Sequence, residues 1–353
     1  MAVHLGKAIL SSLVKSKTSK QLFQRWMKSE RNPSVRFDSY KVAVLKKIGK
    51  PLEIKSVSAP KSLNKDEVRI TTEACGINLS DVYLCSGEYE DLKPKLPFYP
   101  GYEISGTVAE IGSAVENLRS GDRVVAINKD RNGGFAEQCI APAKDVWILS
   151  PNVSLIDAAS LVCNYGLGYL SMARRANINK DDVVVVTAMA GGLGLAALDL
   201  AANVYRTKVI GICPSNDHCN IMREKGAWST VVQGKKGSVI KSVHDVAGKN
   251  GVKIVFDGVG GNMFADVVQC VSHEGSVIVA GFASKIIPTI KTNILLPQSF
   301  SLIGVSLAHY RESARDIYRE TIEEVLKMAE EKFIEPHISA TFPLDQVRIE
   351  LYI

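Results

Sequence analysis

The chain has 353 residues, of which 46% are hydrophobic, so it is long enough for two domains that each bury a core. No uninterrupted apolar run approaches the roughly 20 residues that a membrane-spanning helix needs. The formal net charge is +6, and residues 1–29 alone hold six basic residues and no acid, which leaves 37 basic against 37 acidic residues elsewhere. That balance does not indicate a broad basic surface for a nucleic acid, and we expect no nucleic-acid partner.

The first 35 residues have the composition of a mitochondrial transit peptide. They are basic and rich in Ser and Thr, and Leu5, Ile9 and Leu13 recur at helical spacing. We therefore expect residues 1–35 to direct the chain to the mitochondrial matrix and to be removed there. A disordered basic arm is the alternative that composition leaves open.

Seven cysteines are scattered along the chain, and no two of them form a C-x-x-C pair. This spacing indicates neither a disulfide framework nor a thiolate zinc lobe. We expect reduced thiols, as in a matrix protein.

Residues 36–163 are rich in short runs typical of β-strands, separated by Gly and Pro. Predicted strands include residues 68–71, 104–111 and 123–127, the last of them introduced by a turn at Gly121 and Asp122. These runs predict a mainly antiparallel β domain.

The pattern changes at residue 164 to short apolar strands that alternate with helical segments. Six strands are predicted, at 183–187, 208–212, 230–232, 253–257, 276–280 and 301–305. This rhythm over residues 164–306 is typical of a doubly wound parallel sheet, so the chain is of the α/β class. Residues 307–353 then carry a predicted helix at 313–332 and an extended end.

A glycine-rich turn lies between the four-valine strand at 183–186 and the helical stretch at 195–202. Free backbone N–H groups at such a helix start, together with the helix dipole, bind a pyrophosphate. Gly191 would let the backbone approach the phosphate, and Gly194 would let the helix pack closely on the strand. The predicted dinucleotide-binding residues of this turn are Ala188, Gly191, Gly192, Leu193 and Gly194. An ordinary strand-to-helix connection is the alternative.

The tip of the second strand indicates which dinucleotide binds. NAD-binding sites usually place a carboxylate about 20 residues after the glycines, to hold the ribose hydroxyls. Here that position falls in Cys-Pro-Ser-Asn at 213–216, which has no acid. Ser215 and His218 could bond a 2′-phosphate, which favours NADPH, while nearby Asp217 leaves NAD as the alternative.

Three segments of the chain together carry a resemblance to a known family. The first is residues 75–87 (CGINLSDVYLCSG), the second joins residues 97–106 (PFYPGYEISG) to Gly-Asp-Arg-Val at 121–124, and the third is the turn at 188–194. Together they resemble the zinc-independent quinone oxidoreductases of the medium-chain dehydrogenase/reductase superfamily, and within them the quinone oxidoreductase-like protein 2 group. The resemblance covers residues 40–347. It implies a GroES-like catalytic domain at 36–163, a Rossmann NADP-binding domain at 164–306 and a return to the catalytic domain at 307–353.

The same resemblance indicates that no zinc binds. Related zinc alcohol dehydrogenases carry a Cys ligand where Asn78 stands and a His ligand where Tyr102 stands. Cys163 falls near their third ligand, but one soft ligand cannot hold a tetrahedral zinc ion. We therefore predict that the chain holds no metal.

Without a metal, hydride transfer to a simple ketone is difficult, because the alkoxide product needs a Lewis acid. Transfer to a quinone or an α,β-unsaturated carbonyl gives a phenolate-like or enolate anion, and a phenol has a pKa of about 10. A few hydrogen-bond donors suffice for such an anion. A quinone or an enone is therefore the predicted substrate.

The resemblance also implies roles for individual residues. Asn78 and Tyr83 would lie beside the nicotinamide, with Tyr83 as the donor to the reduced oxygen. Asn164 would lie near the ring, and Phe282 would close over the cofactor. The alternative for Tyr83 is a core aromatic residue on a strand.

The family continues past its F-P-L-x-x-V segment, here residues 342–347, into a helix and a final strand, whereas this chain ends at Ile353. We therefore expect part of the catalytic domain to be missing. Residues 299–306 form an apolar, uncharged edge strand. Quinone oxidoreductases pair such edges, so a homodimer is expected.

Two other functions remain open at this stage. An enoyl-thioester reductase would need a basic cluster at the mouth of the cleft, which the sequence alone does not locate. A non-enzymatic, cofactor-binding relative is the alternative from a different class.

Overall fold

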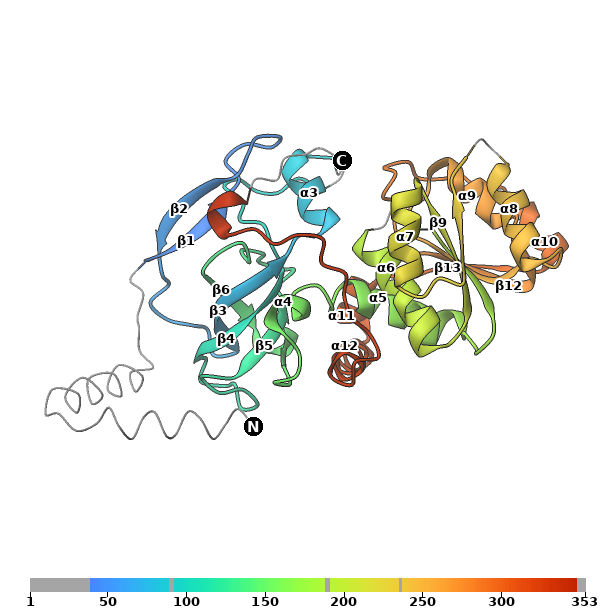
Figure 1. The fold of residues 1–353 in the computed structure, drawn as a ribbon. Coiled ribbons are helices and arrows are strands. Elements are labelled where there is room, and N and C mark those ends of the chain that lie inside the picture. Colours follow the sequence, from blue (N-terminus) through green and yellow to red (C-terminus); the bar gives the residue numbers. More distant parts are fainter. Residues whose placement is uncertain (1–38, 89–91, 188–190, 235–236, 348–353) are drawn as a thin grey trace, which may run out of the picture.

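The computed structural model describes residues 39–88, 92–187, 191–234 and 237–347. The predicted transit peptide and Ala188 lie outside these residues. The described residues form an antiparallel and a parallel sheet at opposite ends of an elongated molecule, with helices between and around them (Figure 1). The predicted fold class, a GroES-like β domain with a Rossmann-type parallel sheet, is confirmed. No described helix is both long enough and apolar enough to span a membrane.

Five antiparallel strands, in the order β6-β3-β4-β5-β7, form the main sheet of the first domain. They are β3 (Glu67–Gly76), β4 (Glu103–Ile111), β5 (Arg123–Ile127), β6 (Gln138–Pro142) and β7 (Val146–Ile148), and β1 (Ser39–Val44) pairs separately with β2 (Glu53–Ser58). Val68 and Ile70 alternate along β3 and are fully buried against Val108 and Val124. Glu67 and Arg69, whose side chains point to the other face of β3, are also buried, so this half of the strand is covered on both faces.

Six parallel strands form the second sheet, in the order β10-β9-β8-β11-β12-β13. Their bounds are β8 (Val183–Thr187), β9 (Lys208–Cys213), β10 (Ser229–Val232), β11 (Val252–Asp257), β12 (Val271–Val279) and β13 (Ser301–Gly304). The predicted strands overlap all six. The strand order reverses between β8 and β11, and such a switch point opens a crevice for a ligand at the carboxyl ends of the strands.

Helices cover both faces of the parallel sheet. Val184 and Val186 of β8 pack on the face covered by α6 (Gly192–Asp199) and α7 (Asn216–Glu224), whereas Val185 packs on the face covered by α8 (Ser238–Ala247) and α9 (Gly261–Val268). Burial on both faces explains why β8 is a continuous run of valines. Other short elements are α4 (Leu155–Ala158), η3 (Leu200–Val204), η4 (Thr292–Ile294), α10 (Leu295–Gln298) and η5 (Leu344–Gln346).

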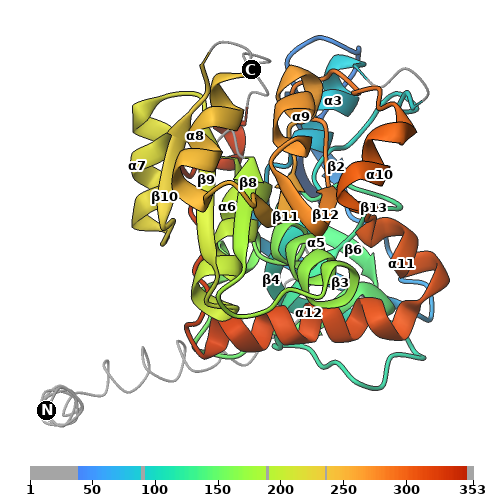
Figure 2. The ribbon, with the colours of Figure 1, turned by 90° about the vertical axis from the view of Figure 1, so that its right-hand side faces the viewer.

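The chain returns to the first domain through α11 (Leu307–Ser313) and α12 (Arg315–Glu330), and α12 is seen nearly end-on between the two sheets in Figure 1 and side-on in Figure 2. The helix predicted at 313–332 corresponds to α12, within two residues at each end. The short helix α11 before it was not predicted, and Ala314, with φ −149° and ψ 63°, separates the two. Arg311 of α11 forms ion pairs with Asp145, in η1 (Ala143–Asp145), and with Asp130, at 2.6 and 2.5 Å. The return segment is therefore fixed to the antiparallel domain by a buried guanidinium.

The expectation of reduced thiols throughout the chain is wrong for one pair. Cys213 and Cys219 form a disulfide, with their Cα atoms 5.8 Å apart. Cys213 ends β9 and Cys219 lies in the first turns of α7, so the fold brings the two sulfurs together across a short turn. A search for C-x-x-C pairs could not find them, since five residues separate the two cysteines.

Candidate active site

The glycine-rich turn lies at the switch point of the parallel sheet. Gly191, the N-cap residue of α6, has extended backbone angles (φ −85°, ψ 167°). A Cβ atom on Gly191 would meet no protein atom within 4 Å, so a ligand can approach the backbone there. Leu193 and Gly194 follow in the first turn of α6. The open cradle and the helix start fit a pyrophosphate.

Thr187 and Asp257 are the last residues of β8 and β11, the two strands on either side of the switch point. The Thr187 hydroxyl donates to Oδ1 of Asp257 at 2.5 Å, and the Gly260 N–H donates to Oδ2 at 3.0 Å. Asp257 is fully buried, and desolvation raises its pKa despite these bonds. This network ties together the two strands that flank the switch point.

Asn164 lies directly against the turn. It is the first residue of α5 (Asn164–Tyr169), which continues as the π-helix η2 (Leu170–Ala176). A Cβ atom on Gly192 would come 2.8 Å from Nδ2 of Asn164. A side chain at position 192 would therefore have to displace the amide of Asn164, a contact between α5 and α6 that the sequence did not reveal.

A buried carboxylate joins Asn78 to the start of α5. Asn78 precedes α3 (Leu79–Ser86), and its Nδ2 donates to Oε2 of Glu103 at 2.9 Å, while the Cys163 N–H donates to Oε1 at 2.8 Å. Desolvation raises the pKa of Glu103 to about 7, against the effect of both bonds. Glu103 was not among the predicted site residues, although it stands in the P-G-x-E segment.

Two further groups surround Asn78. Asp81 accepts from the N–H groups of Asn78 and Gly101 at 3.1 and 3.0 Å, and desolvation raises its pKa to about 6. The hydroxyls of Ser80 and Tyr102 are hydrogen-bonded at 2.8 Å, and Lys129 Nζ lies 4.1 Å from the centre of the Tyr102 ring. This hydroxyl pair was also missed. The sequence feature that could have indicated it is a serine two residues after Asn78, in the first turn of a helix.

Tyr83 lies on the helix α3, so the alternative prediction, a core aromatic residue on a strand, is wrong. Its hydroxyl donates to the carbonyl of Ala283 at 3.3 Å, and Lys285 Nζ lies 5.6 Å from its ring. Lys285 also pairs with Glu88 at 2.6 Å. Phe282 is 37% exposed on the same segment. The predicted residues Tyr83 and Phe282 thus lie on facing segments of the two domains.

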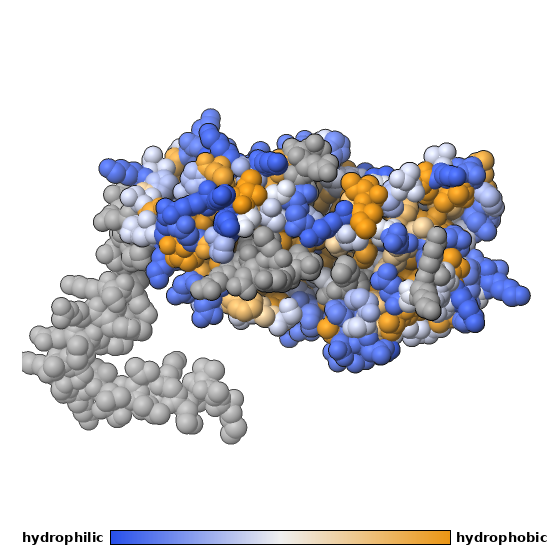
Figure 3. Space-filling view, turned by 90° about the horizontal axis from the view of Figure 1, so that it is seen from above, coloured by the Kyte–Doolittle hydropathy of each residue, from blue (hydrophilic) through white to orange (hydrophobic). Residues whose placement is uncertain are grey.

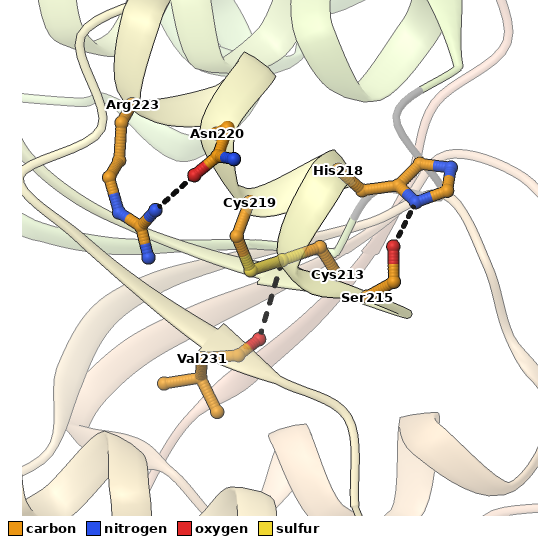
Figure 4. Close-up of a disulfide and its surroundings, with 7 residues drawn as sticks. All are labelled: Cys213, Ser215, His218, Cys219, Asn220, Arg223 and Val231. Carbon is orange, nitrogen blue, oxygen red and sulfur yellow. Dashed lines mark hydrogen bonds between the residues drawn. A yellow bond between two sulfur atoms is a disulfide. The ribbon is translucent and has the colours of Figure 1, made fainter.

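Ser215 and His218 lie together after β9, beside the strand that leads to the glycine-rich turn (Figure 4). Ser215 Oγ lies 2.7 Å from Nδ1 of His218. Ser215 is the N-cap residue of α7, and the strand tip before it carries Pro214 rather than an acid. Asp217 is exposed in the first turn of α7. This arrangement fits a 2′-phosphate at the adenosine end of a dinucleotide.

The described residues contain no group of three or more His, Cys, Asp or Glu side chains placed to hold a metal ion. The three positions compared with zinc ligands carry Asn78, Tyr102 and Cys163. The side chains of Asn78 and Tyr102 are both engaged in hydrogen bonds.

Comparison with known proteins agrees with this fold. Residues 64–151 match the alcohol dehydrogenase GroES-like domain, and residues 192–331 match the family described as zinc-binding dehydrogenase. The chain is 37% identical to quinone oxidoreductase-like protein 2 of Rattus norvegicus, over 87% of each chain. It is 35% identical to the homolog of that protein in Nematostella vectensis, over 94% of this chain and 88% of the relative.

A solved structure shows the same architecture. The quinone oxidoreductase of Escherichia coli, complexed with NADPH, has a TM-score of 0.75 at 25% identity, and the match covers 85% of this chain and 90% of that one. The sequence motifs, the fold and these relatives lead to one conclusion. The chain belongs to the quinone oxidoreductase branch of the medium-chain dehydrogenase/reductase superfamily.

Proposed function

We propose that this protein is an NADPH-dependent oxidoreductase that transfers a hydride to a quinone or an α,β-unsaturated carbonyl without zinc. The observation that carries the proposal is the juxtaposition of the open cradle at Gly191 with Asn164 on α5, whose first turn is tied through Glu103 to Asn78. A dinucleotide seated in the cradle would thus lie next to polar side chains of the first domain.

The residues assigned to the cofactor are those of the turn and of the second strand tip. The N–H groups at the start of α6 would bind the pyrophosphate. Ser215 and His218 would bind the 2′-phosphate, which no carboxylate at the strand tip repels. The bound cofactor supplies the hydride.

The chain's own groups then have to stabilise the developing oxyanion. Tyr83 is the donor proposed for this oxygen, and its bond to the Ala283 carbonyl would be exchanged for one to substrate. The Asn78 amide has two hydrogens, of which one is donated to Glu103, so the second could be donated to the substrate oxygen. These are weak donors, and they suit a quinone or an enone, whose reduced oxygen is a much weaker base than an alkoxide.

Independence from zinc is proposed from the residue types. An amide and a phenol stand where zinc relatives carry ligands, and both are hydrogen-bonded to protein groups. Cys163 would be the only soft ligand of the three, too few for a tetrahedral site. Elemental analysis of the purified protein, with activity assays in the presence of a chelator, checks this directly.

The test of the function is a screen of cofactor oxidation by the purified chain. NADPH and NADH are each offered with quinones, enones and enoyl thioesters. We expect faster oxidation of NADPH by a quinone or an enone, a rate reduced at least about tenfold by Tyr83→Phe, and no such loss in the control Tyr169→Phe. Binding of NADPH without oxidation by any acceptor would favour the non-enzymatic alternative. Faster oxidation with enoyl thioesters than with quinones or enones would favour the enoyl-thioester reductase alternative.

A further inference from the structure

The disulfide between Cys213 and Cys219 encloses the residues proposed to recognise the 2′-phosphate. It joins the last residue of β9 to the first turns of α7, and Ser215 and His218 lie within the loop that it closes (Figure 4). Both cysteines are fully buried. The other five described cysteines are free, so among the described residues only Cys213 and Cys219 form a disulfide.

Both ends of the closed loop are anchored by the fold. The Gln233 N–H donates to the carbonyl of Cys213 at 2.8 Å, which holds the end of β9 against β10. Cys219 packs with Met222 in the large core cluster. What the disulfide adds is therefore a constraint on the turn between the two anchors, where Ser215 and His218 lie.

The start of α7 lacks the side-chain hydrogen bond that usually fixes such a turn. A serine at the N-cap position normally accepts a hydrogen bond from a backbone N–H of the first turn. Ser215 makes no such bond, and its hydroxyl pairs with Nδ1 of His218 instead. When the hydroxyl donates to Nδ1, the hydrogen of the ring lies on Nε2, on the other side of the imidazole, where it can donate to an anion.

We infer that the Cys213–Cys219 disulfide positions Ser215 and His218 for the 2′-phosphate, and that its reduction to two thiols weakens the binding of NADPH but not of NADH. The inference rests on the proposed function, because it takes this turn as the binding site of the adenosine phosphate. In the reduced chain the first turn of α7 loses its covalent brace, and Ser215 is free to cap the helix instead of orienting His218.

The redox step needs a dithiol as co-reactant. One thiolate of the dithiol attacks one sulfur of the pair, the Cys213–Cys219 bond breaks, and a mixed disulfide forms. The second thiol of the reductant then attacks its own sulfur in the mixed disulfide and releases the cysteine that is bound there. The reductant leaves as a disulfide, and its two electrons and two protons reside on Cys213 and Cys219 as thiols.

Burial of both sulfurs means that the dithiol reaches them only when the turn opens. A ligand that bridges Ser215 and His218 would hold the turn closed. By reciprocity of coupled equilibria, if the disulfide favours NADPH binding, NADPH must favour the disulfide by the same factor. Bound NADPH should therefore shift the redox equilibrium of the pair toward the disulfide, and NADH should shift it less.

The experiment compares the full chain before and after treatment with dithiothreitol, with thiols counted by alkylation and mass spectrometry. Binding of four probes is measured by titration: NADPH, NADH, 2′,5′-ADP and 5′-AMP. We expect reduction to raise the dissociation constants of NADPH and 2′,5′-ADP about tenfold, the value of one hydrogen bond to a charged group, and to leave those of NADH and 5′-AMP within about twofold. General loosening of the domain would weaken all four alike.

Two variants complete the test. The double variant Cys213→Ser, Cys219→Ala should bind like the reduced chain and should not respond to dithiothreitol. Cys270→Ala, which removes a buried free cysteine from the same domain, should behave like the unaltered chain. The inference is overturned if the thiol count shows no disulfide before reduction, or if the NADPH-to-NADH affinity ratio does not change. Absence of NADPH binding in both redox forms would overturn the proposed function as well.

Discussion

At the scale of single residues, the main feature of the candidate site is Glu103, a buried carboxylate whose two oxygens are bonded to donors from α3 and from the start of α5. It connects a helix of the first domain to the segment that leads into the second. Its burial makes the ionised form costly, so the protonation of this one group affects both stability and the position of Asn78.

Replacing Glu103 by Gln should reduce the dependence of stability on pH. The pKa of Glu103 is raised from 4.5 to about 7, so the folded chain binds the proton more tightly than the unfolded chain. The stability from this group is present below pH 4.5 and is lost as the pH rises through about 7, at up to about 1.4 kcal/mol per pH unit.

Urea unfolding at several pH values between 4.5 and 8 measures this slope. Asp81 and Asp257 shift in the same direction, so some slope should remain in Glu103→Gln. The control Glu116→Gln, at an exposed position, should keep the full slope. An unchanged slope in Glu103→Gln would contradict the reasoning.

Replacing Ser215 by Asp should reverse the order of cofactor affinity. The new carboxylate would repel a 2′-phosphate and accept from the ribose hydroxyls of NADH. We expect the dissociation constant of NADPH to rise at least about tenfold and that of NADH to fall or stay constant, as measured by fluorescence titration. Asn220→Asp, which adds the same charge at an exposed position of α7, is the control. Tighter binding of NADH by the unaltered chain would refute the NADPH assignment.

At the scale of elements, α11 holds the return segment in place through one side chain. Arg311 is 5% exposed, and it contacts Asp145, which is fully buried. The hydrogen bonds that Arg311 donates to Asp145 and Asp130 raise its pKa further above the ordinary value, although burial opposes this. Arg315 gives Asp145 a second partner at 3.1 Å.

Replacing Arg311 by Met should destabilise the chain, because it leaves Asp145 buried with Arg315 as its remaining partner. Breaking a buried pair from one side costs about 3–5 kcal/mol, and Arg315 should keep the loss near the lower end. Chemical unfolding measures the difference from the unaltered chain. Arg174→Met, at an exposed position of η2, should cost less than about 0.5 kcal/mol. Equal effects of the two substitutions would show that the Arg311 pairs contribute little.

At the scale of the whole molecule, β13 is an edge of the parallel sheet, as predicted. Leu302 on this strand is 38% exposed, and Ile287 and Leu296, in neighbouring segments of the same domain, are 74% and 77% exposed. Figure 3 shows apolar side chains on both halves of the molecule, so the exposed fractions of these three side chains, rather than this view, indicate the edge. We propose that a second copy of the chain covers this edge.

Light scattering of the unaltered chain should therefore give the mass of a homodimer. Leu302→Lys should shift it toward the monomer, because a lysine on an edge strand opposes pairing with another strand. Ile148→Lys on β7, an edge of the antiparallel sheet, serves as the control and should remain dimeric. A soluble, monodisperse monomer of the unaltered chain would exclude edge pairing.

The transit peptide proposed at residues 1–35 makes a prediction about the cell. A fluorescent reporter fused to these residues should enter mitochondria, because the segment is basic, rich in Ser and Thr, and amphipathic. Lys15→Glu with Lys17→Glu should reduce import. Retention of the unaltered fusion in the cytosol would favour the disordered basic arm.

The sequence by itself determined the class of fold and the location of the glycine-rich turn. Period-two runs and apolar strands alternating with helices depend on neighbours in the chain, so the strands at 123–127 and 183–187 were predicted with their exact bounds. Gly191 could be assigned because its requirement, an open backbone before a helix, is local.

Only the tertiary structure decided how residues distant in sequence meet. The bonds of Glu103 to Asn78 and Cys163 span 25 and 60 residues, and the bond of Tyr83 to Ala283 spans 200. Their geometry depends on how two domains pack, which no local pattern encodes. The Cys213–Cys219 pair is close in sequence, but it depends on the path of the turn between β9 and α7. Burial also raises the pKa of Glu103, because it is packing, rather than sequence, that removes water from a carboxylate.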